Sequence, residues 1–302
     1  MTHGIVNLDK PVGMTSHDCV MKMRRIFQTK KVGHTGTLDP DVRGVLPICI
    51  GEATKIVPYL TDTLKTYRAE VTLGFSTTTE DQTGEKVDVK EVEETFPTSV
   101  ITDILTHFKG ASTQITPLYS AVKVNGKKLY EYARANIPVE RPKRSIEVKQ
   151  IALLPDSIIF ENGLCRFKFE ATVSKGTYIR TLCVDIGKAM GYPAHMSHLI
   201  RTQVADFKLD EATTFDNLEV LKEANQLDRV LYPLQRGVSH LPVYYVSDKL
   251  KERVNYGQKL QRPAEFLANR PYRMEHEGRL LAIYQTHPDD ESIIKPLRGF
   301  NL

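Results

Sequence analysis

Two segments with strictly alternating apolar and polar residues constrain the fold most strongly. In YRAEVTLG, residues 67–74, every second side chain from Tyr67 is apolar. The same pattern runs through CRFKFEATVSKG, residues 165–176, as far as Val173. A strand turns successive side chains to opposite faces, so a period of two predicts a strand buried on one face. The chain is therefore expected to build a sheet with one well-covered side.

Other segments predict the elements that accompany this sheet. Short apolar runs predict two further strands, at 4–8 and 45–50. A capping residue at Thr15 or Ser16 predicts a helix to about residue 27, and Pro97 and Thr98 open a second one to about residue 108. A third helix is predicted at 177–190. The chain therefore mixes helices and strands, and it shows no internal repeat.

A domain boundary is predicted near residue 238. The chain has 302 residues, which is long enough for two domains. The stretch PLQRGVSHLP, residues 233–242, breaks the pattern, and only short elements follow it. These are a helix at about 248–256 and strands at about 272–274 and 280–284. We therefore predict a large domain at 1–236 and a small one at 240–302.

Composition limits the classes of protein to consider. No apolar run approaches the roughly 20 residues of a membrane span, and the N-terminus lacks the pattern of a signal peptide. A cytoplasmic protein is expected. The four cysteines are far apart and form no C-x-x-C motif, which favours buried free thiols over a zinc site. A net charge of +4 permits a polyanionic partner without requiring one.

The stretch GHTGTLDPDVRGVLP, residues 33–47, places Asp39 between glycines and directly before Pro40. Such residues bring the backbone close to a ligand and hold it in one conformation. An EF-hand starting at Asp39 fails, because Arg43 and Ile50 stand where oxygen ligands are needed. An aspartyl phosphotransferase fails because no hydrophobic strand precedes the acid. The local alternative is that Asp39 forms an Asx-turn or caps a helix.

Two further features suggest anion binding. Arg180 lies in the first turn of a predicted helix, where the helix dipole disfavours a cation, so it is expected to face a carboxylate or a phosphate. A surface position is the alternative. The segment 114–144 is basic and rich in tyrosine, with a short helix expected at 129–134. It fits either an RNA-binding insertion, mobile until RNA binds, or a solvated basic loop.

Four blocks of the sequence, spread over residues 4–187, resemble the bacterial TruB family. They are GIVNLDKPVGMTSHDCV, KKVGHTGTLDPDVRGVLPICIGEATK, ITPLYSAVKVNGKKLYEYAR and VSKGTYIRTLCVDIG. Members of this family are tRNA pseudouridine synthases that act on the uridine at position 55 in the T loop. The last 60 residues, less specifically, resemble the PUA domain, a small RNA-binding domain of the family.

The resemblance implies roles for seven residues. Asp39 is the catalytic aspartate, and the implied substrate-binding residues are His34, Lys55, Tyr67, Tyr178, Arg180 and Leu199. In the family, the arginine pairs with the aspartate, the strand tyrosine packs on the target base, and the histidine takes part in flipping that base. One departure is Thr78, which stands where the family often has an acid, whereas Asp81 is retained.

The resemblance also implies a fold and partners. The fold is α/β of the α+β type, a pseudouridine synthase fold with a mixed, largely antiparallel sheet and a PUA-like β-rich domain. The implied partner is the T arm of tRNA, with no cofactor, metal, membrane or protein partner, and the chain is expected to be a monomer. Two rivals are a silent tRNA-binding or folding protein and a synthase for another RNA. Whether Asp39 attacks C6, attacks C1′ or only moves protons is left open.

Overall fold

The computed structural model describes residues 2–268 and 270–300, and its chain forms two compact units. The first unit combines residues 1–63 with 204–302, and the second unit is residues 64–203. The chain thus leaves the first unit, builds the second and then returns. This division differs from the boundary predicted near 236–240, which stays a prediction.

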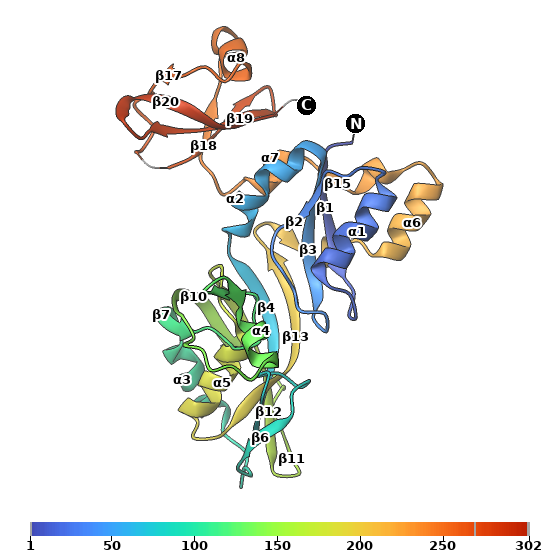
Figure 1. Ribbon diagram of the computed structural model, residues 1–302, viewed down its shortest axis with the longest axis vertical. Coiled ribbons are helices and arrows are strands. Elements are labelled where there is room, and N and C mark those ends of the chain that lie inside the picture. Colours follow the sequence, from blue (N-terminus) through green and yellow to red (C-terminus); the bar gives the residue numbers. More distant parts are fainter. Residues whose placement is uncertain (1, 269, 301–302) are drawn as a thin grey trace. The chain divides into compact units, whose positions relative to one another are not determined.

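The first unit is built around β1 (Gly4–Lys10). This strand pairs antiparallel with β3 (Arg43–Ile50) on one side and with β15 (Leu231–Tyr232) on the other. The short strand β2 (Val32–His34) adds to β3 (Figure 1). All seven residues of β1 are buried, because both faces of this sheet are covered, and they include the polar residues Asn7, Asp9 and Lys10.

Helices cover both faces of β1 and β3. On one face lie α1 (Ser16–Ile26) and α6 (Phe215–Glu223), which bury residues such as Met23 and Leu218 against the strands. On the other face lie η1 (Gly51–Ile56), α2 (Val57–Thr61) and α7 (Leu234–Gly237). The connecting elements of this unit are β14 (Phe207–Lys208), η2 (Leu209–Glu211) and η3 (Leu227–Val230).

The end of the chain forms a second sheet, which confirms that this region is β-rich. The order of its strands is β16 (Val243–Tyr245), β18 (Tyr272–His276), β19 (Arg279–His287), β20 (Asp290–Gly299) and β17 (Leu260–Gln261). Helix α8 (Asp248–Asn255) contacts this sheet. The predicted helix and strands are therefore present, and the sheet has its own apolar core around Met274 and Tyr284.

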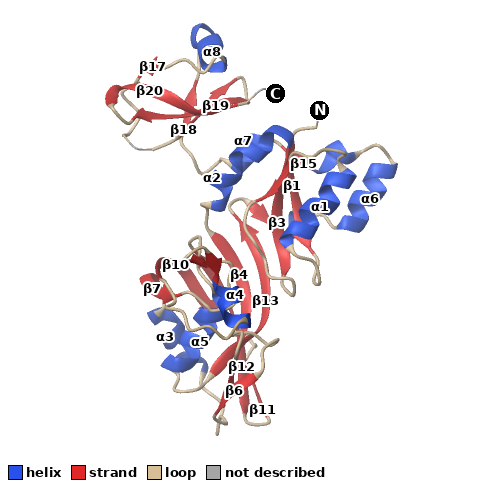
Figure 2. Cartoon of the chain, in the orientation of Figure 1, coloured by secondary structure: helices blue, strands red, loops and turns tan. Residues whose placement is uncertain are grey.

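The second unit contains both alternating segments as strands of one sheet. Its strand order is β13 (Ala194–Val204), β4 (Lys65–Leu73), β12 (Leu164–Val173), β10 (Lys143–Leu153) and β7 (Gly110–Ile115), with β11 (Ile159–Glu161) beside β12 (Figure 2). The predicted buried face is confirmed, since Cys165 to Val173 are at most 1% exposed at every second position. Helix α3 (Thr98–His107) contacts β10, and helix α5 (Ile179–Ala189) contacts β4.

The helices begin and end close to their predicted limits. Thr15 caps α1 in a capping box with Asp18, and α4 (Leu129–Arg134) has the predicted bounds. Within each unit the described pairings of the main sheet are antiparallel, which agrees with the expectation of a mixed, largely antiparallel sheet.

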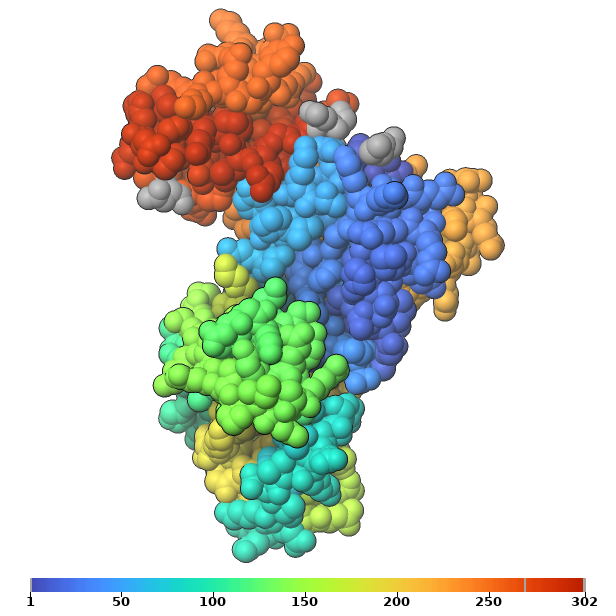
Figure 3. Space-filling view, in the orientation of Figure 1, coloured from blue at the N-terminus to red at the C-terminus, as the bar shows by residue number. Residues whose placement is uncertain are grey.

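Two hairpins complete the second unit. They are β5 (Phe75–Thr77) with β6 (Lys86–Val89), and β8 (Lys123–Val124) with β9 (Lys127–Lys128). The second hairpin belongs to the predicted insertion, 114–144, whose ends are paired strand residues, Lys143 with Ile115 and Arg144 with Gln114. The green atoms of the insertion gather into one raised surface (Figure 3). No helix among the described residues is long and apolar enough to cross a membrane.

The four cysteines are buried and free, as predicted. Burial raises the pKa of Cys19 to about 11 and also raises the pKa values of Cys49, Cys165 and Cys183. Because only the thiolate reacts readily, the thiols should be unreactive in the native state at pH 8. We predict that a thiol reagent labels on average less than one cysteine per molecule of native protein, and all four after denaturation. Rapid labelling of any thiol in the native protein would show that its burial is incomplete.

Candidate active site

The backbone on both sides of Asp39 is held by hydrogen bonds. The Ser16 hydroxyl accepts from the Leu38 N–H at 2.9 Å and donates to the Leu38 carbonyl at 3.3 Å. After the acid, the Pro40 carbonyl accepts from the Gly13 N–H at 2.9 Å and from the Lys10 ammonium at 3.1 Å. The residue before Asp39 and the residue after it are thus both tied to the body of the unit.

Asp39 also begins a turn. Its carbonyl accepts from the Val42 N–H at 3.1 Å, which closes a turn with Pro40 at the second position, where proline fits best. Gly36 and Gly44, on either side, have φ values of +138° and +128°, which favour glycine. The predicted glycine and proline frame is therefore present. A turn and then β3 follow Asp39, so the alternative of a helix cap is wrong.

An ion pair closes the same loop at its far end. Arg43 places Nη2 2.6 Å from Asp9 Oδ2 and Nε 3.1 Å from each Asp9 oxygen. Asp9 lies on β1 and is 8% exposed, so this two-pronged contact joins the end of the loop to the central strand. The hydrogen bond to Asp9 raises the pKa of Arg43.

Two other predicted residues belong to this first unit. His34 ends β2, and its Nδ1 accepts from the Gly36 N–H at 3.3 Å, so the proton of a neutral ring would sit on Nε2. The Lys55 ammonium lies 2.6 Å from Glu52 Oε2 and donates to the Gly299 carbonyl at 2.8 Å. The bond to Gly299, at the end of β20, joins η1 to the last sheet. A role for Lys55 in binding substrate stays a prediction.

Arg180 anchors the candidate site in the second unit. Its guanidinium donates to the Thr79 carbonyl and the Tyr119 carbonyl, each at 3.0 Å. Nη1 also lies 3.6 Å from Asp81 Oδ2. The residue is 7% exposed, and a buried cation is stable only when it is paired. The expectation that Arg180 faces an anion is confirmed by the Asp81 carboxylate.

The Asp81 carboxylate is held by threonines of its own loop. Its Oδ1 accepts from the Thr79 hydroxyl at 2.7 Å, from the Thr83 hydroxyl at 2.6 Å and from the Thr83 N–H at 2.9 Å. Thr78, which stands where the family often has an acid, accepts from the Glu85 N–H at 3.2 Å and thereby closes the hairpin of β5 and β6. The loop between β5 and β6, residues 78–85, thus forms a cradle that holds the Arg180 guanidinium.

The remaining predicted residues lie on elements next to each other in the second unit. Tyr67 is on β4, is 9% exposed and pairs with Ala171 of β12. Leu199 is on β13, which neighbours β4. Tyr178 is the N-cap of α5, and the amide of Gln114 bonds to both its N–H, at 2.8 Å, and its carbonyl, at 3.0 Å. The anchors Gln114 and Ser16 were not identified from the sequence.

The insertion combines cations with an aromatic ring. The Tyr130 ring lies 5.3 Å from the Lys128 ammonium and 5.2 Å from the Arg134 guanidinium. The hairpin of β8 and β9 turns at Asn125 and Gly126, both with positive φ. Asn-Gly is a strong signal for such a turn, so the sequence did contain this hairpin, which was not predicted. Across the described residues, no three His, Cys, Asp or Glu side chains form a group that could hold a metal.

Comparison with known proteins identifies the family. Residues 24–179 match the N-terminal domain of the TruB family of pseudouridylate synthases, and residues 180–239 match a C-terminal domain of tRNA pseudouridylate synthase B. The chain belongs to the TruB family. These matches cover the seven predicted residues. The chain beyond residue 239 lies outside both matched domains.

Individual relatives agree with this assignment. The chain is 53% identical to tRNA pseudouridine synthase B of Bacillus subtilis over 99% of its own length and 97% of the relative. It is 50% identical to that of Halalkalibacterium halodurans, over 97% of this chain and 96% of the relative. Among solved structures, a chain of a Cbf5-Nop10-Gar1 complex is 29% identical with a TM-score of 0.71, covering 94% of this chain and 78% of that one. A chain of an H/ACA RNP bound to a substrate RNA containing 2′-deoxyuridine is 25% identical with a TM-score of 0.72, covering 99% and 85%.

The cradle around Arg180 makes Gly84 a sensitive position. A Cβ atom there would lie 2.7 Å from the Thr79 nitrogen and 2.5 Å from its hydroxyl, so Gly84→Ala must displace the residue whose carbonyl accepts from Arg180. We predict that Gly84→Ala slows pseudouridine formation at least about tenfold, because small displacements at an active site are costly.

The matched control is Gly299→Ala, where an added Cβ meets no atom within 4 Å. The single-turnover rates of the two variants should be compared once thermal unfolding has shown that the two variants are equally stable. An unchanged rate for Gly84→Ala would mean that the position of Thr79 does not matter for the reaction.

Proposed function

We propose that this protein converts the uridine at position 55 in the T loop of tRNA into pseudouridine, with Asp39 as the reacting carboxylate. Membership in the TruB family supports pseudouridine formation in tRNA. The observation that supports Asp39 is the fixed backbone on both sides of it, through Leu38 and Pro40. A surface acid would gain nothing from such a frame, whereas a reacting group must be held in one place.

The reaction is an isomerisation. The bond from uracil N1 to ribose C1′ breaks, the base turns, and a bond from C5 to C1′ forms. A proton leaves C5, and one is taken up at N1, so no atom or electron is gained or lost. The reaction therefore calls for an intramolecular transferase without a cofactor. A carboxylate can serve it as a nucleophile or as a base, and both roles require the ionised form.

The base has to leave its loop before it can react, and enzymes that act on bases hold them in a pocket by stacking. We assign this holding role to Tyr67, with Tyr178 and Leu199 at the same pocket, and a part in base flipping to His34. Tyr67 suits the role because β4 fixes its backbone and a ring offers a flat face to a base.

The proposed role of Arg180 is to keep Asp39 ionised. A guanidinium near a carboxylate lowers its pKa, by roughly 1–3 units at close range. Two carbonyls, of Thr79 and Tyr119, and the Asp81 carboxylate orient the guanidinium. A rigid, planar cation of this kind cannot be replaced by lysine, which is a flexible point charge.

Grip on the tRNA is assigned to residues away from the reacting group. The basic insertion, 114–144, is proposed to hold phosphates of the T arm, and Lys55 and the PUA-like domain, 240–302, to contact further parts of the tRNA. In this proposal the enzyme acts as a monomer, without a protein partner, in the cytoplasm where tRNA is found.

The direct test is Asp39→Asn. Removal of the charge should lower the single-turnover rate of pseudouridine formation on a T-arm hairpin by at least about 100-fold, because acid–base or nucleophilic groups contribute that much or more. RNA affinity, measured in the same buffer, should change by less than about threefold because other residues carry binding.

Asp41→Asn is the matched control. Asp41 lies in the same turn, two residues further on, and is exposed. The Asp41→Asn variant loses the same charge at a position that does not react, so it should keep the wild-type rate. If Asp39→Asn retains more than about one per cent of the wild-type rate, or if Asp41→Asn loses as much, Asp39 is not the reacting group.

A further inference from the structure

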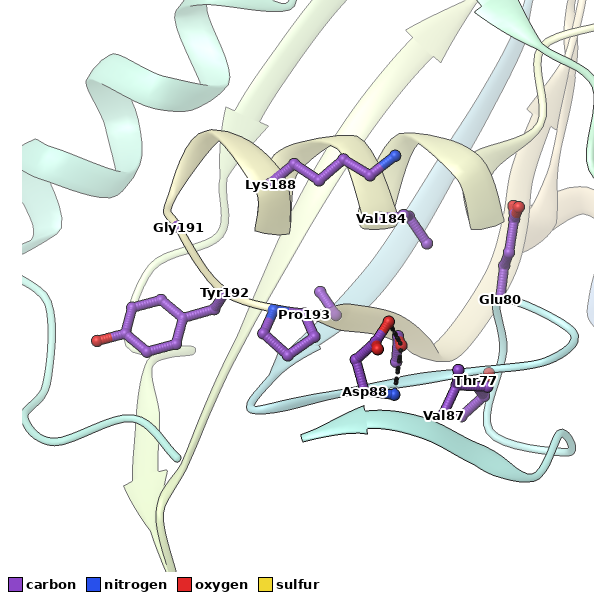
Figure 4. A pocket seen from close by; sticks show the side chains of 11 residues that line it. Thr77, Glu80, Val87, Asp88, Val184, Lys188, Gly191, Tyr192 and Pro193 are labelled. Carbon is purple, nitrogen blue, oxygen red and sulfur yellow. Dashed lines mark hydrogen bonds between the residues drawn. The ribbon is translucent and has the colours of Figure 1, made fainter. Parts of the chain in front are cut away.

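Glu80 stands at the centre of the cradle around Arg180. It lies in the loop between β5 and β6 and has a φ of +64°, a conformation that disfavours residues with a side chain. Its side chain is 17% exposed and helps to line a pocket of about 440 Å³ between that hairpin and α5. Figure 4 shows the carboxylate of Glu80 directed toward the start of α5. A glycine would suit this backbone better, so the glutamate is expected to have a role of its own.

The contacts of Glu80 point to that role. Its Oε2 accepts a hydrogen bond of 2.6 Å from the hydroxyl of Thr181, and its Oε1 lies 3.5 Å from Arg141 Nη1. Thr181 directly follows Arg180 on α5 and is 6% exposed. The bond therefore fixes the turn of helix that carries Arg180. Arg141, which is in the insertion, faces Oε1 of Glu80, and Oε2 accepts from Thr181.

In the sequence, Glu80 also lies between two residues that contact Arg180 itself. Thr79 accepts from the guanidinium through its carbonyl, and Asp81 faces it with a carboxylate. The backbone of Glu80 is fixed as well, since its carbonyl accepts from the Met196 N–H at 3.0 Å. Three successive residues thus hold the first turn of α5, two through Arg180 and one through Thr181.

We propose that Glu80 is a positioning residue for pseudouridine formation, which sets the place of Arg180 through its hydrogen bond to Thr181. This inference rests on the proposed function, in which Arg180 acts on the reaction. Glu80 touches neither substrate nor reacting atoms in this scheme. Its loss should therefore lower the rate of the chemical step while leaving RNA affinity nearly unchanged.

The test uses two variants that remove the bond from either side. Glu80→Gly removes the carboxylate and suits the left-handed backbone, so folding should not suffer from strain. Thr181→Val removes the hydroxyl and keeps the shape of the side chain. Each should lower the single-turnover rate about tenfold, with RNA affinity within about threefold. The double variant should lose no more than the worse single one, because both remove the same interaction.

Two conservative variants separate this bond from a general structural effect. Glu80→Gln keeps an oxygen that can accept from Thr181, and Thr181→Ser keeps a hydroxyl that can donate, so both should stay within about threefold of the wild-type rate. The inference is wrong if Glu80→Gln loses as much as Glu80→Gly, if Glu80→Gly keeps the wild-type rate, or if the two single losses multiply in the double variant. Absence of pseudouridine formation by the wild-type protein would instead overturn the proposed function.

Discussion

A single hydroxyl, that of Ser16, makes the most consequential contact of the first unit. It bonds to both polar atoms of the Leu38 backbone, and the Pro40 carbonyl is held by Gly13 and Lys10. The acid between them therefore has little backbone freedom left to lose when a substrate binds. Catalysis gains most from groups whose positions are fixed before the reaction, and the elements around this loop can be understood as its support.

The second unit depends on a different constraint, which is the burial of a cation. Arg180 is almost wholly buried, and such a charge is costly unless it is paired and hydrogen-bonded. Carbonyls from two segments and the Asp81 carboxylate meet that need, and threonines in turn hold Asp81. The hairpin turn, the start of the insertion and the start of α5 are thus tied together through one side chain.

Sequence reasoning succeeded where structure follows a local pattern. Alternation identified β4 and β12, a capping residue at Thr15 or Ser16 identified α1, and Pro97 with Thr98 marked the start of α3. It failed where distant polar groups meet, as for Ser16 with Leu38, 22 residues apart, and Gln114 with Tyr178, 64 residues apart. Periodicity predicts which face of an element is buried, but it does not predict which polar side chain forms hydrogen bonds with a distant backbone group.

The candidate site was predictable only in part for the same reason. The residues around Asp39 allowed either a turn residue or a reacting group, and only the family resemblance favoured the reacting group. The expectation of an anion for Arg180 came from the helix dipole and was confirmed by Asp81.

The most direct test of the whole account is to map pseudouridines after incubating the purified wild-type protein with tRNA transcribed without modifications. The account predicts pseudouridine at uridine 55 and at no other position; its absence, or its appearance at other uridines instead, would contradict the account in favour of a silent binder or a synthase with another target.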